Sequence, residues 1–187
     1  HLSICIYYAT WFFSTRYISN YNIMDFPILS SLILLPLVGS LFILFVKSDA
    51  SNNYQSSKYV ALFTSFVNFL ISIYLWYLFD NSISEFQFIE DKQWLRGFVN
   101  YKVGIDGISI LFILLTTLIT PLSIISINNS ISSRLKEFLI AMLVMESLMI
   151  GVFCSLDLVI FYLFFEGGLI PMFLIIGIWG GSRRVYS

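Results

Sequence analysis

Long apolar runs alternate with short polar stretches along this chain. Five of the runs are long enough for a helix that crosses a bilayer, since about 20 residues span the hydrocarbon core. They cover residues 27–46, 59–79, 105–127, 138–156 and 158–179. The pattern therefore predicts an all-α integral membrane protein, with five transmembrane helices in one membrane domain over residues 25–187.

The first 24 residues do not follow this pattern. The apolar run from Ile4 to Phe13 has about half the length of a spanning helix, and Arg16 and a polar stretch follow it. Neither a basic segment before the run nor a small-residue cleavage site after it marks a signal peptide. We expect residues 1–24 to form an extension that is interfacial or disordered.

The longest polar connection, residues 80–104, lies between the second and third expected helices. Partial alternation of apolar and polar side chains from Glu85 to Glu90 predicts a strand. The run from Phe98 to Val103 could pair with it, so we expect a short surface hairpin. Asp106, directly after the hairpin, is suited to cap the third helix by accepting from its first N–H groups.

Prolines lie inside several of the expected helices. Pro36 is expected to kink the first helix. Pro121 in the third follows threonines whose hydroxyls can bond the carbonyls that a kink frees. A kinked packing helix is favoured there over a water-lined gate.

Composition supports the membrane assignment and excludes several kinds of site. Apolar residues make up 58% of the chain and charged residues 11%, whereas soluble domains carry about 25% charged residues. Basic and acidic residues nearly balance, so nucleic acid is not an expected partner, whereas lipid is. Cys5, Cys154 and the single histidine, His1, show no metal-ligand spacing, and no Gly-rich phosphate loop occurs. We expect no metal or cofactor site in this chain.

Loop charges predict the orientation. If five helices alternate, the linkers 47–58, 128–137 and 180–187 share one side of the membrane. They hold six basic residues, Lys47, Lys58, Arg134, Lys136, Arg183 and Arg184, against two acidic ones. By the positive-inside rule this side faces the cytoplasm or matrix, and the N-terminus faces the opposite side.

Two carboxylates, Glu146 and Glu166, lie near the middle of the fourth and fifth expected helices. A charge at bilayer depth costs about 2.5–3.5 kcal/mol on insertion scales, so such residues point to function. A group that binds and releases a proton there could serve as a proton relay. The alternative is that each glutamate only hydrogen-bonds a neighbouring helix. That alternative is weaker for Glu166, which precedes Gly167, Gly168 and Pro171.

Three segments resemble subunit 4 of the proton-pumping NADH:ubiquinone oxidoreductase, an antiporter-like membrane subunit of respiratory complex I. They are Val103–Ser109, Gly151–Leu158 and above all Phe161–Gly180, with its Phe-Phe-Glu and a proline five residues on. The resemblance covers residues 26–187. It implies a fold of about fourteen helices with inverted repeats and a line of charged residues at the membrane midplane. It also implies that Glu166 pairs with a lysine on the seventh helix and takes part in proton translocation.

The chain ends just after the fifth expected helix, before that lysine. We therefore expect the N-terminal portion of a split or truncated subunit 4, with other membrane-arm subunits as partners and a second polypeptide supplying the remaining helices and the lysine.

Other subunits would hold the flavin, iron–sulfur clusters and quinone. Abundant Phe, Ile, Tyr, Asn and Ser with very few Ala suggest an AT-rich genome, as in many mitochondria. Together with the resemblance and the loop charges, this leads us to expect the mitochondrial inner membrane, with the N-terminus on the intermembrane-space side. The alternative functions are a subunit of a multi-subunit cation/proton antiporter and a structural membrane scaffold.

Overall fold

A computed structural model of the chain describes residues 27–45, 53–82, 85–95, 99–127 and 134–180. Within them are five long helices: α2 (Ile28–Phe45), α3 (Asn53–Leu78), α4 (Gly107–Ser126), α5 (Leu135–Cys154) and α6 (Leu158–Trp179). All five are long and apolar enough to cross a membrane. The expected all-α membrane fold is thereby confirmed, whereas the expected extension over residues 1–24 lies outside the described residues.

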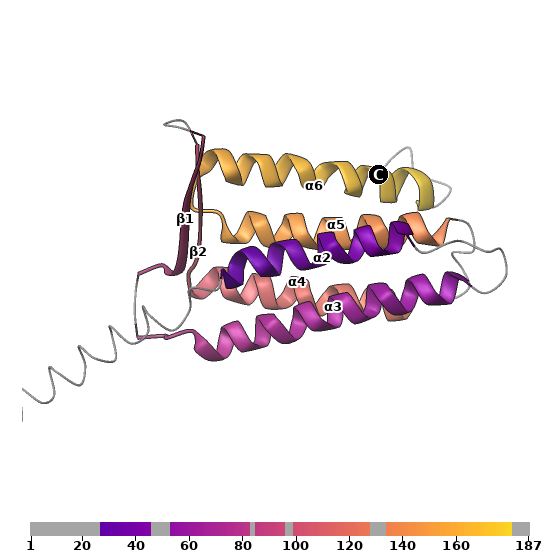
Figure 1. Cartoon of the computed structure of the whole chain (residues 1–187), viewed down its shortest axis with the longest axis horizontal. Coiled ribbons are helices and arrows are strands. Elements are labelled where there is room, and N and C mark those ends of the chain that lie inside the picture. Colours follow the sequence, from indigo (N-terminus) through magenta and orange to yellow (C-terminus); the bar gives the residue numbers. More distant parts are fainter. Residues whose placement is uncertain (1–26, 46–52, 83–84, 96–98, 128–133, 181–187) are drawn as a thin grey trace, which may run out of the picture.

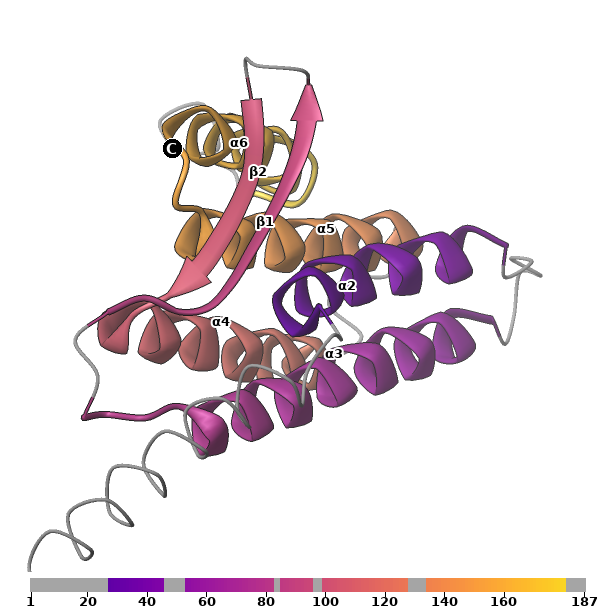
Figure 2. The same cartoon turned by 60° about the vertical axis from the view of Figure 1, so that its left-hand side comes forward.

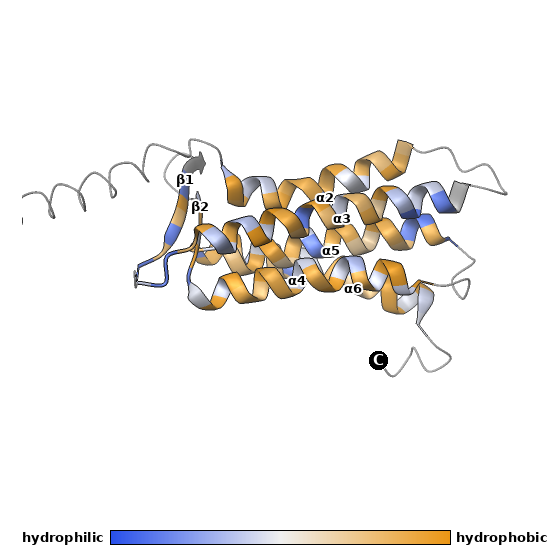
Figure 3. Ribbon diagram, turned by 90° about the horizontal axis from the view of Figure 1, so that it is seen from below, coloured by the Kyte–Doolittle hydropathy of each residue, from blue (hydrophilic) through white to orange (hydrophobic). Residues whose placement is uncertain are grey.

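The helices lie side by side as a bundle, with a two-stranded hairpin across one end (Figure 1). Helix α5 packs against each of the other four helices, whereas α6 packs mainly on α5 at the edge of the bundle. Most helical residues are apolar, and hydrophilic residues lie in the hairpin, near the middle of the bundle and at the end opposite the hairpin (Figure 3). Many large apolar side chains are exposed on the helices. That distribution suits a bundle whose outer surface faces lipid.

The hairpin between α3 and α4 is confirmed, and it is longer than expected. Strand β1 (Gln87–Leu95) pairs antiparallel with β2 (Val99–Ile105). The polar residues after Glu90 continue β1, because backbone pairing with β2 does not depend on side-chain polarity. The register shifts between Gln87 and Glu90, where Phe88 has a φ of 54°. Three steps along β1 here match two steps along β2, so β1 contains one extra residue, as in a β-bulge.

Glu90 fastens the hairpin to the start of α2. Its Oε1 accepts from the backbone N–H groups of Leu29 at 2.9 Å and Ser30 at 3.3 Å. Its Oε2 accepts from the Ser30 hydroxyl, and that hydroxyl also lies 3.2 Å from the Tyr101 hydroxyl of β2. Burial raises the pKa of Tyr101, and the negative charge of Glu90 adds to the effect, while the hydrogen bond with Ser30 opposes it. Figure 2 shows the two strands crossing the end of the bundle where α2 begins.

Side-chain caps begin two of the helices. Asp106 caps α4 as expected, accepting from Ser109 N–H at 2.7 Å, and this bond holds the pKa of the Asp106 carboxyl below its usual range. Asp157 caps α6 in the same way, accepting from Val159 N–H at 2.8 Å. The sequence interpretation treated Asp157 only as part of a short connection and did not anticipate this cap.

Most helix ends lie within three residues of the expected bounds, and two of the differences have a clear structural reason. Helix α3 begins at Asn53, six residues before the expected start at 59, because polar residues can continue a helix beyond its apolar segment. Helix α5 ends at Cys154, before the expected 156. The next residues leave the helix to pair with β2: Ser155 bridges to Val103, and Leu156 N–H donates to the Lys102 carbonyl at 3.0 Å.

Candidate functional site

A layer of buried polar side chains crosses the middle of the bundle. Its members, called the polar layer below, are Asn68 and Ser72 of α3, Thr117 of α4, and Glu146 and Ser147 of α5. On each of these helices the layer separates two apolar clusters, one towards the hairpin and one towards the opposite end. Helical spacing produces this arrangement, because residues three or four apart share one helix face.

The centre of the polar layer is the pair formed by Asn68 and Glu146. The amide Nδ2 of Asn68 donates to Oε1 of Glu146 at 2.9 Å. Asn68 has no exposed surface and Glu146 is 2% exposed. The remaining oxygens, Asn68 Oδ1 and Glu146 Oε2, are buried and have no hydrogen-bond partner among the described residues. Since buried polar atoms are nearly always bonded, this pair is incomplete as a set of donors and acceptors.

The hydroxyls of the polar layer have partners. Ser72 and Thr117 bring their hydroxyl oxygens within 2.7 Å of each other, and each also lies within hydrogen-bond distance of a backbone carbonyl of its own helix. Ser147 donates to the Ile33 carbonyl of α2 at 2.5 Å. The atoms of the polar layer that have no hydrogen-bond partner among the described residues therefore belong to Glu146 and Asn68.

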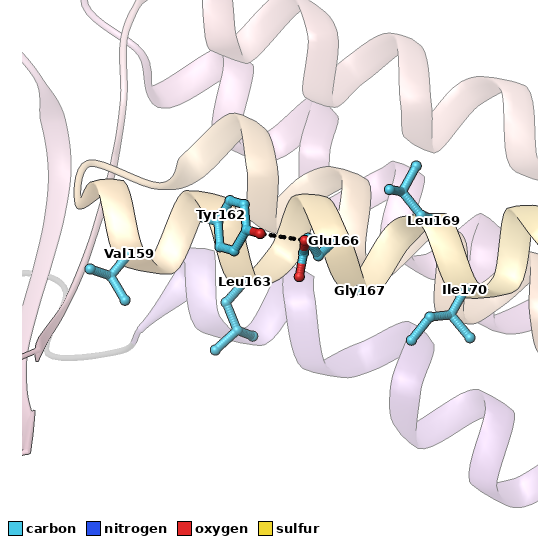
Figure 4. A pocket seen from close by; sticks show the side chains of 7 residues that line it. All are labelled: Val159, Tyr162, Leu163, Glu166, Gly167, Leu169 and Ile170. Atoms are coloured by element: carbon cyan, nitrogen blue, oxygen red, sulfur yellow. Dashed lines mark hydrogen bonds between the residues drawn. The ribbon is translucent and has the colours of Figure 1, made fainter.

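Glu166 lies in a different environment from Glu146. Its side chain is exposed on α6 and accepts a hydrogen bond from the Tyr162 hydroxyl one turn earlier. Both line an open groove whose described walls come from α6 alone, as Figure 4 shows. The remaining wall residues are apolar side chains and Gly167. The two predicted carboxylates are therefore not brought together: Glu146 faces the bundle interior, and Glu166 faces outward.

Gly151 of α5 permits close contact between α5 and α6, whereas the two glycines after Glu166 are not needed for it. A Cβ on Gly151 of α5 would lie 2.7 Å from the Phe164 ring of α6. A Cβ on Gly167 would come within 3.4 Å of Leu148, whereas one on Gly168 would meet nothing within 4 Å. Gly167 is therefore at ordinary van der Waals distance from Leu148, Gly168 faces open space, and the close approach of the two helices lies at Gly151.

The sequence of the chain is similar to those of known proteins, although no family model matches it. NADH-quinone oxidoreductase subunit M of Rhodobacter capsulatus is 56% identical over 133 residues, which are 71% of this chain and 26% of that protein. NADH-ubiquinone oxidoreductase chain 4 of Marchantia polymorpha is 47% identical over 157 residues, 83% of this chain and 31% of the relative. The chain belongs to this subunit M/chain 4 family.

The family identity extends to other relatives. Subunit M of Rickettsia prowazekii is 42% identical over 165 residues, 88% of this chain and 34% of that protein. The resemblance expected from Val103–Ser109, Gly151–Leu158 and Phe161–Gly180 is confirmed, and the antiporter and scaffold alternatives are not favoured. The chain spans about a third of the length of these subunit M and chain 4 relatives.

The sequence interpretation of this subunit M/chain 4 chain missed Asn68 as the hydrogen-bond partner of Glu146. It was visible only as a polar residue inside an apolar helix. A signal was present, because Ser57, Ser65, Asn68 and Ser72 recur at helical spacing and are all buried along α3. The described residues contain no group of three or more His, Cys, Asp or Glu side chains that could hold a metal ion.

Proposed function

We propose that the chain is part of the proton-translocating membrane arm of a respiratory NADH–quinone oxidoreductase, located in the mitochondrial inner membrane. Its relatives are named as subunits of such oxidoreductases. Its five apolar helices suit a multi-pass membrane protein. Flavin, iron–sulfur clusters and quinone would carry electrons in other subunits, and this chain would take part in moving protons.

Two lysines, Lys58 and Lys136, support an orientation with the hairpin in the intermembrane space. Lys58 Nζ donates to the Ile127 carbonyl at 2.6 Å, and Lys136 Nζ donates to the Leu44 carbonyl at 2.9 Å. Both lie at the end of the bundle opposite the hairpin, where the negative C-terminal ends of the α2 and α4 dipoles stabilise a nearby cation. Under the positive-inside rule that end faces the matrix.

One observation supports Glu166 as the transport residue: its helix is the least covered of the five. Only 11% of the α6 span is buried, against 28–44% for the other four. Lipid can cover the apolar part of this surface, but it is a costly neighbour for a carboxylate. We propose that the remaining helices of the subunit cover this face and bring a lysine within ion-pair distance of Glu166. Those helices come from another polypeptide or from a longer form of this one.

A carboxylate and a movable ammonium together form a switchable proton site. The nearby ammonium favours the ionised carboxylate, and its withdrawal favours protonation. Alternation between the two arrangements would let Glu166 take a proton from one side and release it towards the other. The Tyr162 hydroxyl, which donates to Glu166, would hold the carboxylate in one rotamer during the exchange.

The test is Glu166→Gln in the assembled complex, with Glu137→Gln as the matched control. Glu137 lies on the same bundle but at the surface, where it forms an ion pair with Arg134 at 3.9 Å. We expect Glu166→Gln to assemble and to lower proton transport per NADH oxidised by about tenfold or more, since positioned proton-transfer groups contribute roughly 10²–10⁴-fold in rate. Glu137→Gln should transport protons like the unmodified complex.

Assembly on native gels and dye-reported proton uptake into vesicles are the two measurements. An assembled Glu166→Gln complex that pumps at the rate of the Glu137→Gln control would reject the proposed role of Glu166. Glu166→Asp provides a second arm, because it keeps an acid on a shorter side chain and should retain part of the activity.

A further inference from the structure

The Asn68–Glu146 pair has a bonding pattern that one added proton would complete. A single hydrogen bond of 2.9 Å joins the two groups, between Asn68 Nδ2 and Glu146 Oε1. The two atoms without a partner among the described residues, Asn68 Oδ1 and Glu146 Oε2, are both oxygens. An amide oxygen and an ionised carboxylate oxygen can only accept hydrogen bonds, so neither can satisfy the other.

Protonation of the carboxyl changes that balance. A neutral carboxylic acid has one O–H donor in addition to its acceptor oxygen. We infer that Glu146 and Asn68 form a proton-binding pair, in which Glu146 is held as the neutral acid and Asn68 is its positioning residue. The step adds one proton to Oε2, and the new O–H is directed to Asn68 Oδ1. Each group then donates once to the other and accepts once from it.

The surroundings of the pair favour a neutral acid over an ion. Helices α2 and α4, which pack on α5, have no acidic or basic residue in their spans. On α3, the Lys58 ammonium donates to the Ile127 carbonyl far from Asn68, and Tyr59, Tyr74 and Tyr77 are exposed.

The remaining ionisable groups on the packed elements lie elsewhere. On α6, Tyr162 and Glu166 face outward. At the two ends of α5 are Lys136 and Glu137, near the start, and Cys154, which is buried beside the hairpin. On β2, Lys102 is exposed and Tyr101 lies against Ser30. None of these groups is hydrogen-bonded or ion-paired to Glu146, so none offsets a buried negative charge.

This inference separates two carboxylates that the sequence interpretation assigned to the same task. Glu146 would store a proton inside the bundle, whereas Glu166 would exchange one at the α6 face. The use of the stored proton in transport rests on the proposed function. The protonation state of the pair does not rest on it, and the two ideas can fail separately.

Infrared spectra of the assembled complex in membranes, compared between the unmodified complex and each variant, test whether Glu146 is protonated. A protonated carboxyl has a carbonyl stretch distinct from amide and ionised carboxylate bands, and it shifts in heavy water. We expect such a band at neutral pH in the unmodified complex. It should be absent in Glu146→Gln, shifted in Asn68→Leu, which removes the amide partner, and unchanged in Glu137→Gln.

Assembly provides a second, independent measurement. Glutamine at 146 would present an N–H donor where the acid presents O–H, so Glu146→Gln should assemble as fully as Glu137→Gln. The inference is overturned if Glu146→Gln removes only ionised carboxylate bands, which would mean that water or a cation meets the free oxygens. It is also overturned if Glu146→Gln alone prevents assembly. An unshifted band in Asn68→Leu would reject the positioning role of Asn68.

Discussion

Replacing Glu90 by alanine is expected to loosen the first turn of α2 while leaving the hairpin paired. The first N–H groups of a helix have no partner within the helix. Glu90 supplies one from the hairpin, accepting from Leu29 N–H at 2.9 Å and from Ser30 N–H at 3.3 Å. Its charge also lies at the positive end of the helix dipole.

The size of the effect follows from those two contributions. Loss of a capping side chain costs about 0.5–2 kcal/mol, and loss of a charge at a helix N-terminus costs about 0.3–1 kcal/mol. Together the free energy of opening the first turn should fall by roughly 1–3 kcal/mol, which corresponds to amide exchange faster by roughly 5- to 150-fold. Glu90→Gln keeps an acceptor oxygen but loses the charge, so it should fall between alanine and the unmodified chain.

Hydrogen exchange followed by mass spectrometry on a peptide that covers the start of α2 measures this directly. Asp91→Ala is the matched control, because Asp91 is the next residue of β1 and its side chain is exposed. Equal exchange in Glu90→Ala and the unmodified chain would refute the capping argument. Equal acceleration by Asp91→Ala would show that the hairpin, and not the cap, controls the first turn.

Two further substitutions test local contacts in the assembled complex. Asp106→Ala should lower stability by about 1 kcal/mol through loss of the hydrogen bond that caps α4 at Ser109. The folded-state pKa of Asp106 is lowered, so the charged cap stabilises the fold above the ordinary aspartate pKa and this contribution is lost as the pH falls through the folded-state pKa. The thermal midpoints of the mutant and unmodified complexes should therefore converge in acid. Gly151→Ala should lower stability by about 1–3 kcal/mol, because its Cβ would lie 2.7 Å from the Phe164 ring. Gly168→Ala is the control: it has open space around it and should leave the thermal midpoint unchanged or higher. Equal midpoints for the two alanine variants would contradict the packing argument.

Local patterns were enough to predict the helices and one of their caps. Runs of apolar residues located the five spans, because each run must satisfy its own backbone within the membrane. The boundaries of α6 agree with the expected 158–179. Asp106 was predicted as a cap because its partner, Ser109, is three residues away, within the reach of local reasoning.

The hairpin was predictable in kind but not in detail. Alternation indicated a strand from Glu85 to Glu90, yet β1 runs from Gln87 to Leu95 with a bulge at its start. A bulge depends on pairing with the other strand, so its position is not encoded in the alternation of β1 alone. The consequence for Glu90, which reaches the start of α2, could not be derived without that pairing.

The sequence by itself determined five membrane-length apolar segments over residues 27–179, the subunit M/chain 4 type of the chain, and two carboxylates at mid-span. Tertiary structure decided what those carboxylates face. Glu146 is buried against Asn68, 78 residues earlier, whereas Glu166 is exposed on the least covered helix. The physical reason is that insertion depends on the length and polarity of each segment. The environment of a side chain depends instead on which helices pack around it, and those contacts join residues far apart in the chain.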